Sequence, residues 1–207
     1  MSLTERLPAR TTRSRNAVRP FEQLALELGP ERPRWTFSRL VVRSPHQRRI
    51  VERLEFVRRF FPELEAATVH VGLAQKRGVL GWGSMDPERP GIWVRPRRLA
   101  YFTIAHEMTH LLQARGLVPQ GERSCDLWAL ARSPLVIDGW PGYLEMPRAL
   151  RARREVDFDA ATFLHRAAIA AIAGRASGRR RYLTDFERAV ADAYGSGRSP
   201  RARGNAR

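Results

Sequence analysis

The stretch YFTIAHEMTHLLQARG, residues 101–116, holds two histidines four positions apart with a glutamate directly after the first. On a helix, His106 and His110 lie on the same side, so both imidazoles can bind one metal ion. Glu107 lies beside them, close enough to accept a proton from a metal-bound water. Apolar residues on the other faces predict a core helix that ends at Gly116. The pattern alone is only moderately specific, because it also occurs by chance.

A metal site needs a third ligand, and Glu122 lies in the next predicted helix, GERSCDLWALARS, residues 121–133. Asp126 follows four residues later on the same helical face, where it can accept the other ring N–H of a metal-bound histidine. The link between the helices contains two glycines and a proline, so the second helix can fold back across the first. Taken alone, Glu122 could simply be an acid favoured by the helix dipole and Asp126 a surface residue. The upstream histidine pair favours the metal site instead.

Other residues are weaker candidates for the third ligand. His165 lies on a long alanine-rich helix, where a packed or surface histidine is the more ordinary interpretation. The remaining candidates are Glu145, Asp138 and Cys125. A cysteine three residues after a glutamate on a helix is typically a small core residue.

Elsewhere the chain indicates strands first and helices later. We expect helices at 21–28, 44–61, 99–115, 121–133, about 148–174 and about 184–194, and strands at 34–42, 67–74, 77–85 and 91–96. Ser44 and Pro45 suit the start of the helix at 44–61, and Pro62 suits its end. Its buried face should hold Ile50, Leu54, Val57 and Phe61. Because strand, helix and strand do not alternate, the pattern predicts an α+β fold.

Composition limits the class of protein. The length of 207 residues fits one domain at 21–195, with disordered basic tails at 1–20 and 196–207. Cys125 is the only cysteine, so an internal disulfide is impossible and a reducing compartment is expected. There is no apolar segment typical of a signal peptide or of a membrane span. We therefore expect a cytoplasmic protein that does not bind membranes.

The formal net charge is +16, a value that ordinarily suggests a nucleic-acid partner. Lys76 is the only lysine among 37 basic residues, an arginine bias typical of high-GC codon usage. Residues 1–20 hold five arginines and one glutamate, and residues 196–207 hold four arginines and no acid, so each tail carries +4. Half of the charge thus lies in the tails. Binding of nucleic acid through these tails stays open but is not favoured.

The motifs HEMTH and GERSCD together resemble the gluzincin metallopeptidases, whose pattern is HExxH followed by ExxxD. The short spacing and the segment AHEMTHLLQ look most like the minigluzincins, small cytosolic zinc peptidases of prokaryotes. The resemblance covers roughly residues 35–145. It implies one zinc ion held by His106, His110 and Glu122, with Glu107 as general base and acid and Asp126 orienting a histidine. It also implies hydrolysis of peptide or protein substrates through a zinc-bound water.

The resemblance further implies a zincin-like architecture. A backing helix lies behind a small mixed sheet of three to four strands, followed by the active-site helix and a helical C-terminal half. In such enzymes the edge strand binds peptide substrate, and this role falls on Gly91, Ile92, Trp93 and Val94, with prolines on both sides. Tyr143 is a candidate for stabilising the oxyanion, although it could equally pack beside Trp140. Some small members of the family are latent.

Three alternative functions stay open. A regulatory protease of the ImmA/IrrE-like group also places a glutamate on a helix after HExxH, but at a longer spacing. A DNA-associated SprT-like protease would use the basic tails on nucleic acid, but it needs a third histidine that the sequence lacks at the expected distance. A non-catalytic zinc-binding protein would need a fourth protein ligand, from Cys125 or Asp126.

Overall fold

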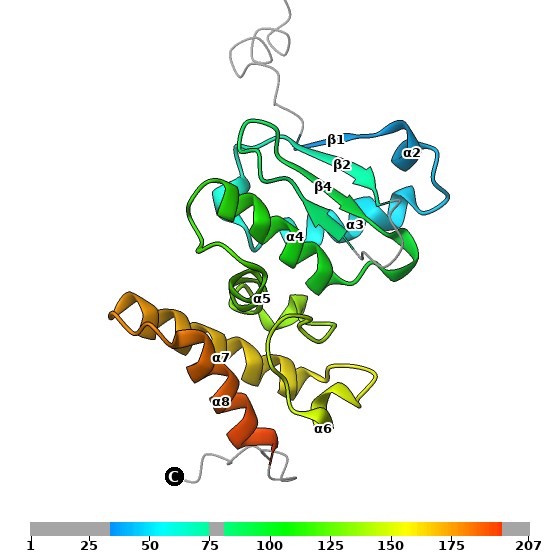
Figure 1. Cartoon of the computed structure of the whole chain (residues 1–207). Helices are drawn as coiled ribbons and strands as arrows, with labels where there is room; N and C mark the ends of the chain where they lie inside the picture. Colours follow the sequence, from blue (N-terminus) through cyan, green and yellow to red (C-terminus); the bar gives the residue numbers. More distant parts are fainter. Residues whose placement is uncertain (1–33, 75–80, 196–207) are drawn as a thin grey trace, which may run out of the picture. The chain divides into compact units, whose positions relative to one another are not determined.

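The structure, a computed structural model, describes residues 34–74 and 81–195 of the chain (Figure 1). These residues belong to one compact unit that begins at Arg34. The tails predicted at 1–20 and 196–207, the helix predicted at 21–28 and the first residues of the strand predicted at 77–85 lie outside the described ranges. Among the described residues, no helix is long and apolar enough to cross a membrane.

The described strands form a four-stranded sheet in the order β1-β2-β4-β3. β1 (Trp35–Phe37), β2 (Val69–Leu73) and β4 (Gly91–Val94) are parallel, whereas β3 (Gly81–Gly83) is antiparallel to β4. The prediction of an α+β fold is confirmed. The sequence predicted no strand–helix–strand unit, and this was wrong for β1 and β2. These two strands are parallel, and the chain between them is helical.

The position of β4 corrects one prediction about the site. β4 lies between β2 and β3, so Gly91, Ile92, Trp93 and Val94 are not an edge strand. The flanking prolines lie outside the paired residues and remove no hydrogen-bond donor from the ladder. After β3, residues 84–90 turn the chain back so that β4 pairs with it. β3 and β1 are therefore the two edge strands of the sheet.

Local capping explains where the helices differ from the predictions. The segment predicted as one strand at 34–42 divides at Ser38, whose side chain accepts from Val41 N and begins α2 (Arg39–Val42). α3 (Gln47–Arg58) begins later than predicted, because the Ser44 side chain accepts from His46 N in the turn before the helix. The long helix predicted at 148–174 is interrupted, because Asp157 caps a new helix. The two pieces are α6 (Arg148–Arg151) and α7 (Phe158–Ala176), and α8 (Tyr182–Tyr194) follows.

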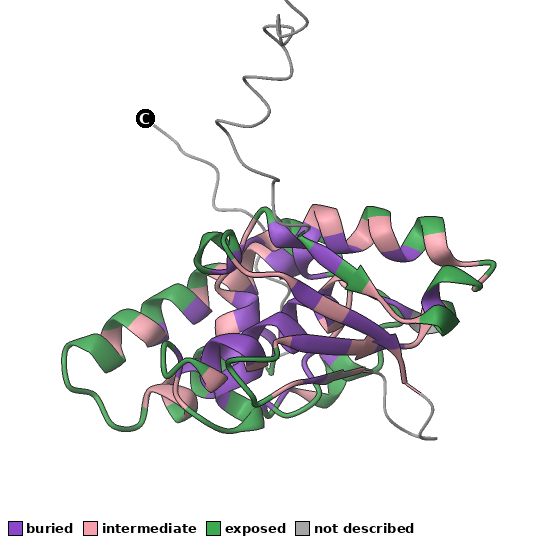
Figure 2. Cartoon of the chain, turned by 90° about the horizontal axis from the view of Figure 1, so that it is seen from above, coloured by how far each residue is buried: buried purple, intermediate pink, exposed green. Residues whose placement is uncertain are grey.

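The core lies between the sheet and the helices. The four residues predicted to face inward on the helix at 44–61 are all fully buried: Ile50, Leu54, Val57 and Phe61. α4 (Tyr101–Ala114) contacts β3, β4, α3 and α5 (Glu122–Leu130). In Figure 1, α5 lies between the sheet with α4 and the pair α7 and α8. Figure 2 shows buried residues along the central strands and the packed helices, while the loops are largely exposed.

The start of α4 is capped by a residue distant in sequence. Ala100, at the N-cap, has no side chain that can accept a hydrogen bond. Instead the carboxylate of Asp138 accepts from Tyr101 N and Phe102 N, both at 2.9 Å. The guanidinium of Arg53 lies 3.6 Å from the same carboxylate. Asp138, which the sequence offers as a weak candidate ligand, is thus a helix cap.

Replacing Asp138 with alanine is expected to lower the free energy of unfolding by about 1–2 kcal/mol, since two amide donors of α4 lose their acceptor. Urea unfolding followed by circular dichroism measures this change. Asp138→Asn keeps one acceptor oxygen and should lose less. An unchanged unfolding midpoint in the alanine variant would show that water caps α4 equally well.

Candidate metal centre

Two helices bring the ionisable side chains of the site together. α4 carries His106, Glu107 and His110, and α5 carries the acidic residues and the cysteine of the predicted site. Gly116 ends α4 with a φ of 71°, and Gly121 precedes α5 with a φ of 100°. Both values lie in the left-handed region, which glycine adopts without strain. The two glycines therefore let the chain turn back so that α5 packs across α4.

The two histidines direct their Nε2 atoms at one carboxylate oxygen. His106 Nε2 lies 3.1 Å from Glu122 Oε2, and His110 Nε2 lies 3.3 Å from the same atom. Neighbouring ligand atoms in a tetrahedral zinc site lie about 3.3 Å apart, given zinc–ligand bonds of about 2.0–2.1 Å. The distance from Glu122 Oε2 to each Nε2 atom thus fits a tetrahedral cation.

The other ring nitrogen of each histidine faces an acceptor oxygen. His106 Nδ1 lies 2.7 Å from Asp126 Oδ1, and His110 Nδ1 lies 2.8 Å from Gln113 Oε1. Asp126 is 1% exposed, and its second oxygen accepts from Tyr143 N at 2.7 Å. In each neutral ring, Nδ1 therefore carries the proton, which leaves a lone pair on Nε2. Two lone pairs and a carboxylate oxygen then face one another, an arrangement that a cation or an added proton must stabilise.

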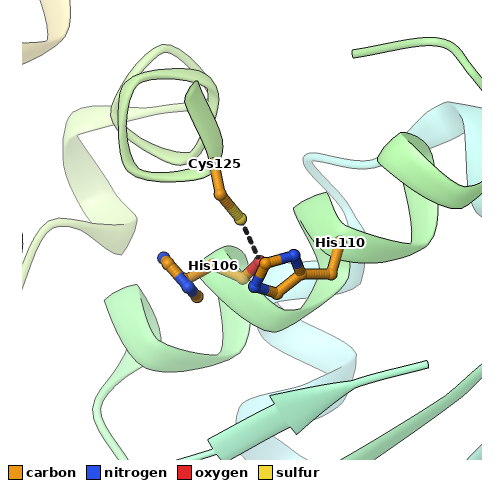
Figure 3. Close-up of side chains that lie close together, drawn as sticks. All are labelled: His106, His110 and Cys125. Atoms are coloured by element: carbon orange, nitrogen blue, oxygen red, sulfur yellow. Dashed lines mark hydrogen bonds between the residues drawn. The ribbon is translucent and has the colours of Figure 1, made fainter. Parts of the chain in front are cut away.

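His106, His110 and Cys125 form a largely buried group that could hold a metal ion (Figure 3). The atoms they offer all lie within 4.8 Å of one another. The Cys125 thiol already donates to the carbonyl oxygen of His106 at 3.0 Å, drawn as the dashed line in Figure 3. Burial also raises the pKa of the thiol, so it stays protonated unless a cation displaces the proton. The two histidines belong to both candidate ligand sets, and the third ligand of a bound ion would be Glu122 or Cys125.

Glu107 is held against β3 at the site. Its side chain is 4% exposed, and within the part of the chain that the structure describes its Oε2 atom has no hydrogen-bond partner. A Cβ atom at Gly81 would lie 2.4 Å from Glu107 Oε1, and one at Gly83 would lie 2.7 Å from His110 Cβ. Only glycine leaves room for the strand at this distance. This oxygen is therefore available to a water, an ion or a ligand.

Burial and neighbouring charges shift the pKa values of these groups. Burial raises the pKa of Glu107 to about 7, helped by two nearby carboxylates and opposed by His106. Burial lowers the pKa of His106, but the hydrogen bond and charge of Asp126 outweigh it, so the pKa is raised overall. Burial and the neighbouring His106 lower the pKa of His110. A divalent cation beside these groups would lower the pKa of each.

Tyr143 covers the site from the loop after α5. Its ring stacks on that of His106, with centroids 5.6 Å apart and planes 19° apart, and the residue is 54% exposed. Burial raises the pKa of its hydroxyl, and the charges of the nearby carboxylates raise it further. The phenol therefore stays protonated at neutral pH and can donate a hydrogen bond.

The remaining candidate ligands lie outside this cluster. His165 Nδ1 donates to the Leu130 carbonyl at 2.9 Å, which is a packing role. Asp138 caps α4, and Glu145 is exposed. The sequence reasoning missed Gln113, whose importance comes from the loop after α4, and the glycines of β3, whose importance comes from their contact with α4.

α8 supports the site through the buried residue Glu187. Glu187 Oε2 accepts from the Arg123 guanidinium at 2.6 Å, and Oε1 accepts from Glu145 N at 2.8 Å. The hydroxyl of Tyr182, also on α8, lies 3.1 Å from Ser124 Oγ. These contacts fasten the first turn of α5, which carries Glu122, to α8.

Comparison with known protein families, with curated proteins and with solved structures finds no match to this chain.

Proposed function

We propose that the protein is a zinc-dependent peptidase of the gluzincin type, with zinc held by His106, His110 and Glu122. The observation that carries the proposal is the convergence of two histidine Nε2 atoms on one carboxylate oxygen beside the buried Glu107. A zincin-like arrangement is supported by the order of α3, the small mixed sheet, α4 and α5, which is the order that the family resemblance implies.

Three observations favour Glu122 over Cys125 as the third ligand. Glu122 Oε2 lies at ligand spacing from both Nε2 atoms, and its side chain is 46% exposed, so it can adjust to an ion. The thiol, in contrast, is buried and already donates to a backbone carbonyl. Either set has three protein ligands and so keeps a position open for substrate, as catalytic zinc sites do, so the choice rests on these three observations.

A bound zinc ion would supply a Lewis acid for a substrate carbonyl and lower the pKa of a coordinated water. Glu107 accepts the proton of the attacking water on its free Oε2 atom and passes it to the leaving amine. Asp126 holds the Nδ1 proton of His106 and so fixes its tautomer. The Tyr143 hydroxyl donates to the developing oxyanion at the mouth of the site.

β3 replaces β4 as the proposed substrate strand. It is an edge strand, and its glycines contact Glu107 and His110. An extended peptide pairing with β3 would place its backbone beside the two residues that do the chemistry. The proposed substrate is therefore an unfolded or extended segment of a peptide or protein.

A peptide library analysed by mass spectrometry tests this function. Protein loaded with one equivalent of zinc is expected to produce new peptide termini, and protein stripped by a chelator is not. Restoring zinc to the stripped protein should restore cleavage. Zinc bound at one equivalent without any cleavage would count against a peptidase and for the second candidate, a zinc site closed by Cys125 as a fourth protein ligand.

A further inference from the structure

Gln113 is a buried amide on α4, three residues after His110. Its Nε2 atom donates to the carbonyl oxygens of Pro119 at 2.7 Å and Gly121 at 3.0 Å. An amide nitrogen carries two hydrogens, and both are used by these carbonyls. Its Oε1 atom is thus left as the acceptor that faces His110 Nδ1 at 2.8 Å.

This arrangement fixes the proton of His110. With an acceptor opposite Nδ1, the neutral ring carries its proton there and its lone pair on Nε2, the atom that faces Glu122. Without that acceptor, a neutral imidazole favours the proton on Nε2, where it blocks metal binding. Gln113 therefore decides which nitrogen of His110 can bind a cation.

The same side chain also holds the loop that positions Glu122. Gly121, whose carbonyl accepts from the amide, directly precedes Glu122 at the first position of α5. The side chain of Gln120 in turn donates to the backbone carbonyl of Gln113 at 2.7 Å. The loop between α4 and α5 thus hydrogen-bonds to both the side chain and the backbone of Gln113.

We infer that Gln113 is a positioning residue that aims both His110 and Glu122 at one metal ion. One of its atoms sets the tautomer of the histidine, and another anchors the segment that carries the carboxylate. The inference rests on the metal site proposed above, but not on the reaction proposed for it.

The test combines zinc affinity with the tautomer of His110. In Gln113→Met, which keeps the volume and removes all three side-chain hydrogen bonds, we expect zinc affinity to fall about tenfold to hundredfold in competition with a chromogenic chelator. In the metal-free protein at alkaline pH, ¹⁵N NMR should show the proton of His110 moving from Nδ1 to Nε2. Gln113→Glu keeps an acceptor oxygen and should preserve the Nδ1 proton.

The control is Gln120→Met, which loosens the same loop without touching a histidine. It should keep the tautomer of His110 and bind zinc within a few-fold of the wild type. The inference is overturned if Gln113→Met keeps the wild-type tautomer, or if Gln120→Met lowers zinc affinity as much as Gln113→Met. If the wild-type chain binds no zinc, the metal site is wrong and the inference falls with it, whereas zinc binding without peptide cleavage overturns only the proposed reaction.

Discussion

Replacing Glu107 with glutamine is expected to abolish peptide hydrolysis and leave zinc bound. Glutamine has the shape of glutamate, so it fits in the same space against Gly81. Its amide cannot accept a proton from water, so the rate should fall by about 10²–10⁴-fold, the usual contribution of a general base. The histidines and Glu122 are unchanged, so the metal content should be that of the wild type.

The measurement is kcat/KM on a peptide that the wild type cleaves, with metal content determined on the same samples. Glu145→Gln makes the same chemical change on an exposed side chain whose carboxylate has no part in the proposed reaction, and it should keep full activity. Hydrolysis that persists in a zinc-loaded Glu107→Gln variant would remove Glu107 from the mechanism.

Glu122→Ala is expected to lower zinc affinity by more than about a hundredfold. It removes a proposed metal ligand, whereas loss of a residue that only hydrogen-bonds to a ligand costs about tenfold to hundredfold. Cys125→Ser should bind zinc as the wild type does, because the thiol donates to a carbonyl in the proposed arrangement. Chelator competition on the purified variants gives both dissociation constants.

The two variants together separate the two ligand sets. Full zinc occupancy in Glu122→Ala would show that the third ligand is another residue, with Cys125 the first to consider. Equal losses in both variants would indicate a closed site with four protein ligands, and so a structural role for zinc. Both variants should be checked by circular dichroism, because α5 packs directly on α4.

The parts of the site that the sequence could predict are those that depend on helical spacing. His106 and His110 share a helix face because of their four-residue separation, and the same spacing places Asp126 one turn beyond Glu122. The apolar pattern likewise predicted the buried face of α3. These features are local, so a short stretch of residues is enough to determine them.

The features that could not be predicted depend on contacts between separate structural elements, or between an element and a loop. Whether β4 is an edge strand depends on where β3 pairs, and flanking prolines do not decide it. The cap of α4 comes from Asp138, 37 positions after Tyr101, and no local signal marks it. Gln113 resembles any polar helical residue until the loop at 119–121 closes on it.

The contact between Glu187 and Arg123 has a consequence for how the site is made during synthesis. The two residues are 64 positions apart, so at about 5–20 residues per second the ribosome adds Glu187 roughly 3–13 s after Arg123. When Glu187 is added, α4 and α5 have already been synthesised without the carboxylate that fastens α5. The nascent chain therefore carries all the proposed zinc ligands before it can hold them rigidly, and tight metal capture should follow the emergence of α8.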